Sequence, residues 1–256
     1  MLVSLTFDVE QDCPPYLNTT RGMEEGLPKI LDLLNEKNIK ATFFFTAEMA
    51  RRYPNLARRV VDEGYELGCH GFNHERFDKL KKSRAEAIIK KSLNVLREFG
   101  DVVSFRAPNL QLPEYLFSSL SKNGIFVDSS KSWYKGYREG VKLIDGVLEI
   151  PVSVTSSKLR LPWSVQKVIH ARLREPRVYF AHPWEFIPMQ KEKIRFDCKF
   201  NTGGNALILL ERLIDYYKDQ NAKFVMIREY LDVYKRKHEK HENATKIVPS
   251  SSIELI

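Results

Sequence analysis

The sequence contains no long apolar run, and no segment reaches the roughly 18 consecutive apolar residues that a membrane-spanning helix needs. The opening residues, MLVSLTFDVE, have neither a basic leader nor a long apolar segment ahead of the first polar motif. They therefore do not resemble a signal peptide. From these two absences we expect a cytoplasmic protein without a transmembrane segment.

Cysteine is also scarce. Cys13, Cys69 and Cys198 are the three cysteines among 256 residues, and they are widely separated, with no C-x2-C spacing. This excludes a secreted scaffold dense in disulfides and a zinc module built on cysteine. We expect three free thiols.

Basic residues outnumber acidic ones, which gives a formal net charge of +8. Such an excess suits an anionic partner, such as a phosphate-bearing or lipid-linked sugar, a membrane surface or nucleic acid. Much of it, however, is dispersed over expected helical faces and the segment KRKHEKHENATK (235–246), which lacks the interleaved aromatic residues of a nucleic-acid surface. We expect a solvated surface and no nucleic-acid partner, and a homo-oligomer is left open.

Apolar, β-branched runs alternate with amphipathic patterns along most of the chain, which is typical of βα units around a parallel sheet. About seven such units favour an α/β fold with an incomplete barrel, over residues 1–234, followed by a charged tail, 235–256. The expected strands are 3–7, 41–45, 65–69, 101–105, 125–129, 147–152, 177–182 and 223–227. The expected helices are 27–38, 50–63, one from a capping box at Ser83 and Glu86 through Leu96, 114–122, 164–174, 205–218 and a closing helix.

Polar residues capable of metal and proton chemistry follow these strands, at the end where barrels of this kind carry their active sites. Asp8 and Glu10 lie on the same side of an extended segment. His70 and His74 are four residues apart, a spacing that puts both imidazoles on one face of a helical turn. One carboxylate and two imidazoles form the open three-ligand set of a catalytic divalent ion, with zinc as the default.

Three further strand ends carry candidate residues. Arg106 could hold a carboxylate bidentately, although a surface arginine has the same sequence signal. His182, which Pro183 leaves at the end of its strand, could donate a proton, although a lone histidine is more often structural. Asp128 could orient that imidazole or simply cap a turn.

Aromatic residues near these loops could stack on sugar rings, and core packing explains them equally well. Our candidate substrate-binding residues are Trp133 and Trp184, with Pro108 from the Arg106-Ala-Pro-Asn segment.

The motifs together resemble the polysaccharide deacetylase family, also called the NodB-homology domain or carbohydrate esterase family four. They are TFDVE (6–10), HGFNH (70–74), FRAPN (105–109), VDSS (127–130) and YFAHP (179–183). The resemblance implies a distorted (β/α)7 barrel. It also implies Asp8 as general base, His70 and His74 as metal ligands, Arg106 as the tether of the base, and His182 as general acid.

One departure from the commoner family pattern is that Val9 replaces a second aspartate and Glu10 follows. We assign Glu10 as third metal ligand, with Asp12 as the alternative. The D-x-E spacing and the stretch 21–45 are similar to branches acting on lipid-linked amino sugars, on peptidoglycan and on ureide-type amides. The implied function is hydrolysis of an acetyl or formyl group from the nitrogen of a sugar, a polysaccharide or a lipid-linked sugar, with one zinc, cobalt or nickel ion. A non-sugar amidase and a non-catalytic glycan-binding barrel are the alternatives.

Overall fold

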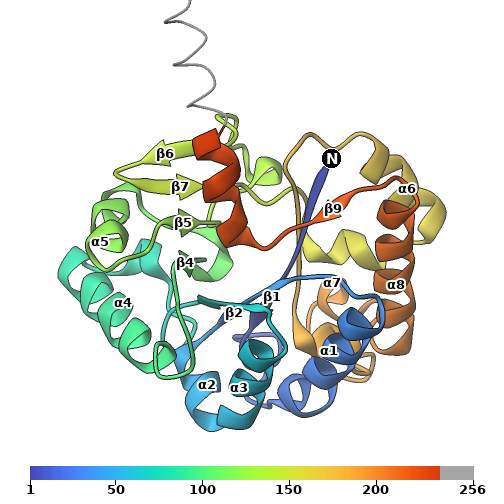
Figure 1. The fold of residues 1–256 in the computed structure, drawn as a ribbon. Coiled ribbons are helices and arrows are strands. Elements are labelled where there is room, and N and C mark those ends of the chain that lie inside the picture. Colours follow the sequence, from blue (N-terminus) through green and yellow to red (C-terminus); the bar gives the residue numbers. More distant parts are fainter. Residues whose placement is uncertain (237–256) are drawn as a thin grey trace, which may run out of the picture.

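The computed structural model describes residues 1–236, which form one curled sheet with helices packed around its outside (Figure 1). The strands pair in the order β6-β7-β5-β4-β3-β2-β1-β8, with β9 beside the start of β1. All pairs are parallel except β6 with β7. The strands are β1 Leu2–Val9, β2 Thr42–Phe45, β3 Glu66–Cys69, β4 Ser104–Phe105, β5 Val127–Asp128, β6 Lys142–Ile144, β7 Val147–Glu149, β8 Arg177–Ala181 and β9 Lys223–Phe224.

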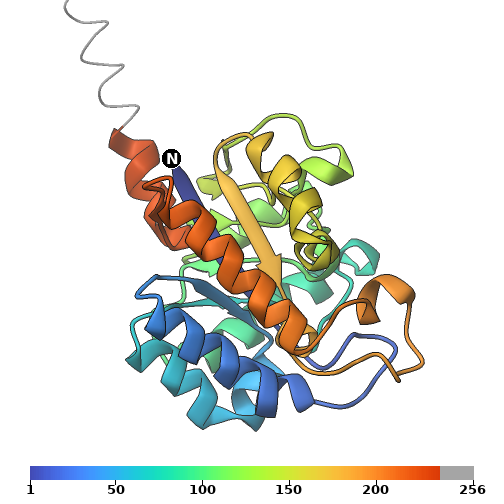
Figure 2. The ribbon, with the colours of Figure 1, turned by 90° about the vertical axis from the view of Figure 1, so that its right-hand side faces the viewer.

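The helices lie between consecutive strands, as the expected βα units require, and α1 and α8 pack side by side on one flank (Figure 2). They are α1 Leu27–Glu36, α2 Ala47–Arg52, α3 Pro54–Asp62, α4 Lys82–Leu96, α5 Phe117–Lys122, α6 Trp163–Ala171, α7 Phe196–Lys199 and α8 Gly204–Lys218. Residues 230–236 are also helical. The expected α/β fold with an incomplete barrel is confirmed. Of the predicted tail, 235 and 236 continue this last helix, and 237–256 lie outside the described residues.

Two predicted helix features are wrong. The helix predicted over 50–63 is broken at Tyr53 (φ −127°, ψ 60°), because the residue before Pro54 is kept out of the helical conformation. The capping box predicted at Ser83 and Glu86 does not form, since α4 begins at Lys82 and its N-cap, Lys81, makes no capping bond.

Strand β1 shows how the sheet divides two cores. Val3, Leu5 and Phe7 belong to a large apolar cluster that also contains the buried faces of the helices. The alternate residues point into the curl of the sheet, where Phe44 and Phe180 belong to a second, smaller apolar cluster. Because the strands are parallel, the ends of β1, β3, β4, β5 and β8 meet at one rim of this interior.

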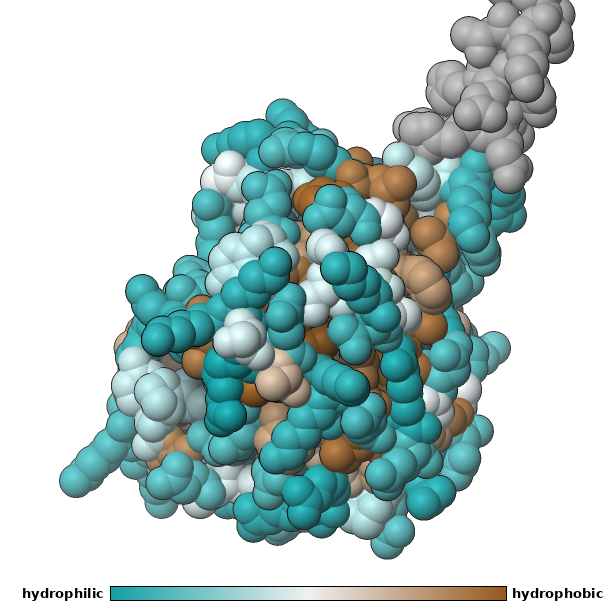
Figure 3. Space-filling view, turned by 90° about the vertical axis from the view of Figure 1, so that its left-hand side faces the viewer, coloured by the Kyte–Doolittle hydropathy of each residue, from teal (hydrophilic) through white to brown (hydrophobic). Residues whose placement is uncertain are grey.

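The outer surface is mainly hydrophilic on the face that Figure 3 shows, with hydrophobic residues in small patches. No helix in the described part of the chain is long and apolar enough to cross a membrane. The three cysteines are free thiols, as expected.

Candidate active site

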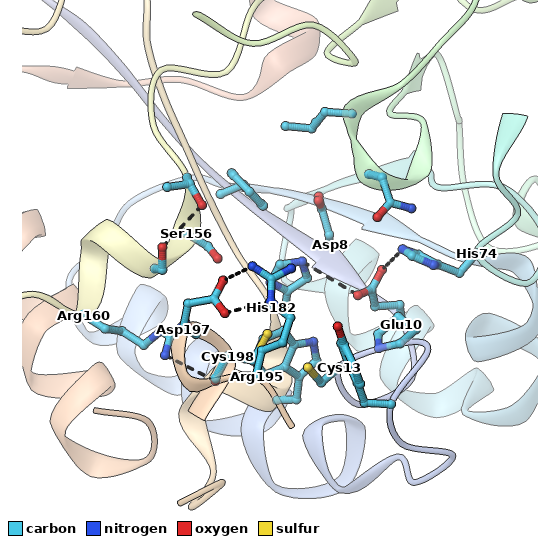
Figure 4. Close-up of a pocket in the computed structure, with 18 of the residues that line it drawn as sticks. Asp8, Glu10, Cys13, His74, Ser156, Arg160, His182, Arg195, Asp197 and Cys198 are labelled. Carbon is cyan, nitrogen blue, oxygen red and sulfur yellow. Dashed lines mark hydrogen bonds and ion pairs between the residues drawn. The ribbon is translucent and has the colours of Figure 1, made fainter. Parts of the chain in front are cut away.

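The strand ends enclose a cavity of about 290 Å³ (Figure 4). Asp8 and Glu10 reach it from β1, and His182 from the end of β8. The segment after β3 contributes His70 and His74. The structure thus brings together five of the residues that the sequence placed at strand ends far apart in the chain.

Glu10 lies between the two imidazoles from the 70–74 segment. Its Oε2 atom is 2.8 Å from Nε2 of His74 and 3.3 Å from Nε2 of His70. The ligand atoms of these three residues all lie within 4.8 Å of one another. His70 donates its Nδ1 proton to the carbonyl oxygen of Arg106 at 2.7 Å, which turns its Nε2 atom toward Glu10.

These side chains fit a divalent cation. Glu10 is buried, and its Oε2 has no hydrogen-bond partner among the described residues. Burial by itself would raise the pKa of Glu10, but the two nearby histidines hold it well below its usual range, so the carboxylate is ionised. A buried carboxylate oxygen facing two imidazole nitrogens is a donor set typical of zinc and similar ions.

Asp12, the alternative ligand, has a different task. Its carboxylate accepts hydrogen bonds from the backbone N–H groups of Arg21 and Gly22, at 2.9 and 2.8 Å, and from the Thr19 hydroxyl at 2.7 Å. These bonds hold the 12–22 segment closed. The structure therefore favours Glu10 over Asp12 as the third ligand.

The segment from His70 to His74 is a loop and not the helical turn that we predicted from the spacing. Gly71 and His74 both have a left-handed backbone, with φ of +82° and +57°. Glu75 fixes the loop by accepting hydrogen bonds from the N–H groups of Phe72 and Asn73. The two imidazoles converge, with ring centroids 5.6 Å apart, because of this local bonding.

Asp8 is held by Arg106, whose side chain is completely buried. One guanidinium nitrogen, Nη1, donates to Oδ1 of Asp8 at 2.7 Å and to the Thr6 hydroxyl at 2.6 Å. Nε and Nη2 donate to the carbonyl and hydroxyl oxygens of Ser129. The bidentate contact predicted for Arg106 is therefore wrong. The guanidinium reaches Asp8 through Nη1 alone, and its other two nitrogens donate to Ser129.

His182 is oriented by Glu185 and not by Asp128, so the orienting role predicted for Asp128 is wrong. The alternative, a carboxylate that caps a turn, agrees with the contact of Asp128 with Ser130. His182 Nδ1 lies 2.7 Å from Oε1 of Glu185, and Oε2 of Glu185 accepts from Nε of Arg160 at 2.6 Å. Burial would lower the pKa of His182, but the hydrogen bond with Glu185 and the charge of Glu10 raise it to about 9. Burial would likewise raise the pKa of Glu185, and Arg160 lowers it to about 2.

Glu185 and Arg160 were missed by the sequence analysis. Glu185 had a local signal, because it follows His182 by three residues in a turn that Pro183 begins, where a side chain can reach back to its neighbour. Arg160 had none, since its contact with Glu185 spans a long stretch of sequence. Asp128 instead accepts from the N–H and hydroxyl of Ser130, at 2.9 and 2.8 Å. Ser130 Oγ in turn accepts from the N–H of Ala107 and so supports the segment after β4.

The predicted substrate-binding residues are only partly in the cavity. Trp184 lines it and stacks on His182, with ring centroids 4.8 Å apart. Among the described residues that line the cavity, neither Pro108 nor Trp133 is found. Pro108 is buried, and the ring of Trp133 is covered by Arg174 at 5.6 Å. The wall is formed instead by their neighbours Asn109 and Tyr134, and by others that include Tyr16, Leu110 and Lys135.

A family model described as polysaccharide deacetylase matches residues 1–127, the half of the chain that carries Asp8, Glu10, both candidate histidine ligands and Arg106. This chain belongs to the polysaccharide deacetylase family. His182 and Glu185 lie beyond the matched residues.

Two curated relatives in this deacetylase family are named for peptidoglycan. A peptidoglycan-N-acetylglucosamine deacetylase of Bacillus cereus is 33% identical over 113 residues, which cover 44% of this chain and 36% of the relative. A peptidoglycan-N-acetylmuramic acid deacetylase of Bacillus subtilis is 40% identical over 60 residues, 23% of each protein. The chain thus matches well under half of the length of either relative.

Solved structures share the fold over most of their length. Peptidoglycan deacetylase PdaC from Bacillus subtilis superposes with a TM-score of 0.59 at 16% identity, covering 95% of this deacetylase-family chain and 96% of its own. A family 4 carbohydrate esterase from Streptomyces lividans has a TM-score of 0.58 at 18% identity and coverages of 88% and 92%. A pseudoenzyme of carbohydrate esterase family 4 from Bacillus anthracis has a TM-score of 0.60 at 18% identity. The superposition covers 89% of this chain and 64% of the pseudoenzyme. Because active and inactive proteins share this fold, the side chains must carry the argument for activity.

Proposed function

We propose that this protein is a metal-dependent amide hydrolase that removes an acetyl or formyl group from the nitrogen of an N-acylated sugar. One observation carries the proposal. The buried Oε2 atom of Glu10, which has no hydrogen-bond partner among the described residues, lies near two imidazole nitrogens. Asp8 and His182 line the same cavity.

The ion would be held by Glu10, His70 and His74, and zinc suits this donor set best, with cobalt and nickel as alternatives. When bound there, a divalent ion lowers the pKa of a coordinated water and polarises the carbonyl of the substrate amide. Three protein ligands leave a position for these groups, as a catalytic site requires.

Asp8 is the group placed to take the proton of the attacking water. Arg106 occupies its Oδ1 atom, so Oδ2 is left to accept a proton. The burial of both side chains and the donors on Thr6 and Ser129 keep the carboxylate in one orientation. This fits a general base, which needs a fixed position before it needs a particular pKa.

His182 is the group placed to protonate the departing amine. Glu185 holds Nδ1, so Nε2 faces the cavity, at 3.7 Å from Oε1 of Glu10. Arg160 fixes Glu185 from the other side. Donation from Nε2 would be the second proton transfer of the hydrolysis, since an amide nitrogen leaves readily only when it is protonated.

The substrate class rests on the lining of the cavity and on the family. Trp184, Tyr134 and Tyr16 offer ring faces or hydroxyl groups to a sugar, and Lys135 puts positive charge at the same wall, where Arg195 is paired with Asp197. Relatives named as peptidoglycan deacetylases support N-acetylated amino sugars within a polysaccharide as the first substrates to try. The cytoplasmic location expected from the sequence stays a prediction.

The metal content of the purified chain tests the proposal directly, by elemental analysis of the wild type beside Glu10→Ala and His74→Ala. We expect about one divalent ion per wild-type chain and none in either variant. Asp12→Asn is the matched control, because that side chain bonds only to the 19–22 segment, and it should retain the ion.

The loaded wild type is then assayed on N-acetylglucosamine oligomers and on ureides. Turnover of the oligomers supports the proposal, and turnover of ureides alone would move the protein to the non-sugar amidases. Bound metal with no turnover on either panel would favour a non-catalytic glycan-binding barrel, and a metal-free wild type after soaking with zinc or cobalt would refute the mechanism.

A further inference from the structure

Two of the three cysteines meet at the wall of the candidate active site. Cys13 follows Glu10 by three residues, and Cys198 lies far along the chain, on α7. Both line the cavity, and Figure 4 shows their side chains beneath His182. They also pack in one small apolar cluster with Trp184, Ile187 and Met189. Cys69 lies apart, fully buried in the main core.

The two thiols interact, and they are not equivalent. The hydrogen bond with Cys198, together with burial, raises the pKa of Cys13 well above its usual range. The same contact lowers the pKa of Cys198. Cys13 is only 2% exposed, whereas Cys198 is partly exposed. Cys198 is therefore the thiol that is open to an oxidant, and Cys13 is the thiol behind it.

We propose that Cys13 and Cys198 form a reversible disulfide, which crosslinks the segment after Glu10 to α7 across the wall of the cavity. The oxidant is a hydroperoxide. The Cys198 thiolate attacks the peroxide oxygen, the O–O bond breaks, and a sulfenic acid and an alcohol or water are formed. Cys13 then attacks the sulfenic sulfur, its thiol proton passes to the departing hydroxyl group as the S–O bond breaks, and water leaves. Two thiols lose two electrons and two protons, and one peroxide is reduced.

The crosslink would join the two halves of the site. Arg160 donates to the carbonyl oxygens of Asp197 and Cys198 and also holds Glu185, the partner of His182. A bond from Cys198 to Cys13 therefore ties the elements that position His182 to the segment that carries Glu10. Because the two cysteines are far apart in sequence, closing this loop restricts the unfolded chain strongly.

The test uses the full-length reduced chain, treated with one equivalent of hydrogen peroxide, digested without reductant and mapped by mass spectrometry. We expect one crosslinked peptide pair joining Cys13 to Cys198, lost on adding dithiothreitol. Oxidation should raise Tm by about 5 to 15 °C. Cys13→Ser and Cys198→Ser should abolish the rise, and Cys69→Ala should keep it.

The readouts are a mass and a melting temperature, so they stand or fall independently of the proposed deacetylase activity. If Cys13→Ser does not fold, wild type alkylated at Cys198 with iodoacetamide replaces it and should show no rise. A sulfinic acid on Cys198 without crosslinking, a crosslink to Cys69 or between chains, or an unchanged Tm of the crosslinked chain would overturn the proposal.

Discussion

The two sides of the candidate site hold their buried charges in different ways. On the side of β1 and β3, Glu10 is ionised and its Oε2 has no hydrogen bond, although two imidazoles are close. On the side of β8, charges alternate in a closed chain from Arg160 to Glu185 to His182, with contacts of 2.6 and 2.7 Å.

The difference shows which side is made for a ligand. A buried carboxylate oxygen that accepts no hydrogen bond costs free energy, so a protein keeps one where a ligand will satisfy it. The side around Glu10 is incomplete without a cation, whereas the side around His182 is complete within the protein and serves to fix one imidazole. Asp8, held by Arg106, lies within reach of the incomplete side but has its own internal partner.

The strongest test of this division is Asp8→Asn. The amide keeps an oxygen for Arg106 but cannot accept a proton at neutral pH, so turnover should fall by about 10² to 10⁴. Metal content should stay near that of the wild type, because Asp8 is not one of the proposed ligands, whereas Tm should fall, because the completely buried Arg106 loses its counter-ion. Steady-state kinetics on the best N-acylated sugar, with elemental analysis of the same sample, provide the measurement. Unchanged turnover would remove Asp8 from the mechanism.

On the side of β8, we expect Glu185→Gln to lower both stability and turnover. Glu185→Gln leaves the buried Arg160 without its counter-ion, which we expect to cost about 3–5 kcal/mol of unfolding free energy. Loss of the support for His182 should lower turnover by about 10- to 100-fold.

Denaturant unfolding and kinetics check these two effects of Glu185→Gln. Asp101→Asn, which removes an exposed ion pair with Arg228, is the control and should change little. Normal stability in Glu185→Gln would mean that the chain of charges contributes nothing to holding the fold.

The same division explains what the sequence could predict. Strand ends are visible in an apolar pattern, and the polar residues after them are adjacent in sequence, so Asp8, Glu10, His70 and Arg106 could be identified. The choice of Glu10 over Asp12 needed the backbone donors at Arg21 and Gly22, which lie on a loop that no periodicity describes.

The supports of the site were harder to find. Arg160 meets Glu185, and Cys198 meets Cys13, through contacts between distant loops for which spacing gives no signal. Of the two aromatic predictions, Trp184 lines the cavity and Trp133 missed it by one residue, beside Tyr134, because the sequence shows position and not side-chain direction. In each case the packing of loops at the rim decided the outcome.

A smaller effect should come from the close contact between Gly26, just before α1, and Pro183, just after His182. The backbone of Gly26 packs against the turn after His182, and a Cβ there would lie 2.0 Å from the carbonyl oxygen of Pro183. Gly26→Ala should therefore destabilise the protein by about 1–3 kcal/mol and lower turnover by displacing that turn. Gly204→Ala meets no atom within 4 Å at the start of α8 and should stabilise by about 0.4–1 kcal/mol. Thermal melts of the two variants provide the comparison. Equal Tm values would mean that the turn after His182 moves to accommodate a Cβ at position 26 without loss of stability.

The smallest effect concerns a third arrangement, in which two buried carboxyl groups face each other. Asp128 and Glu149 are paired neighbours on β5 and β7, and two ionised carboxylates offer only acceptors to each other. Burial and the negative charge of Asp128 raise the pKa of Glu149 well above its usual value, so Glu149 keeps a proton in the folded state.

The folded state therefore binds a proton that the unfolded chain releases above about pH 4.3, and stability must fall as pH rises from there toward the raised pKa. Glu149→Gln supplies a permanent donor and removes this loss. At pH 8 its Tm should exceed that of the wild type by about 2–4 °C, the shift for about 1 kcal/mol in a chain of this size, and at pH 4 the two should agree. Thermal melts across this range provide the check. Parallel curves would mean that Glu149 is ionised in the folded protein and that Asp128 tolerates a second charge beside it.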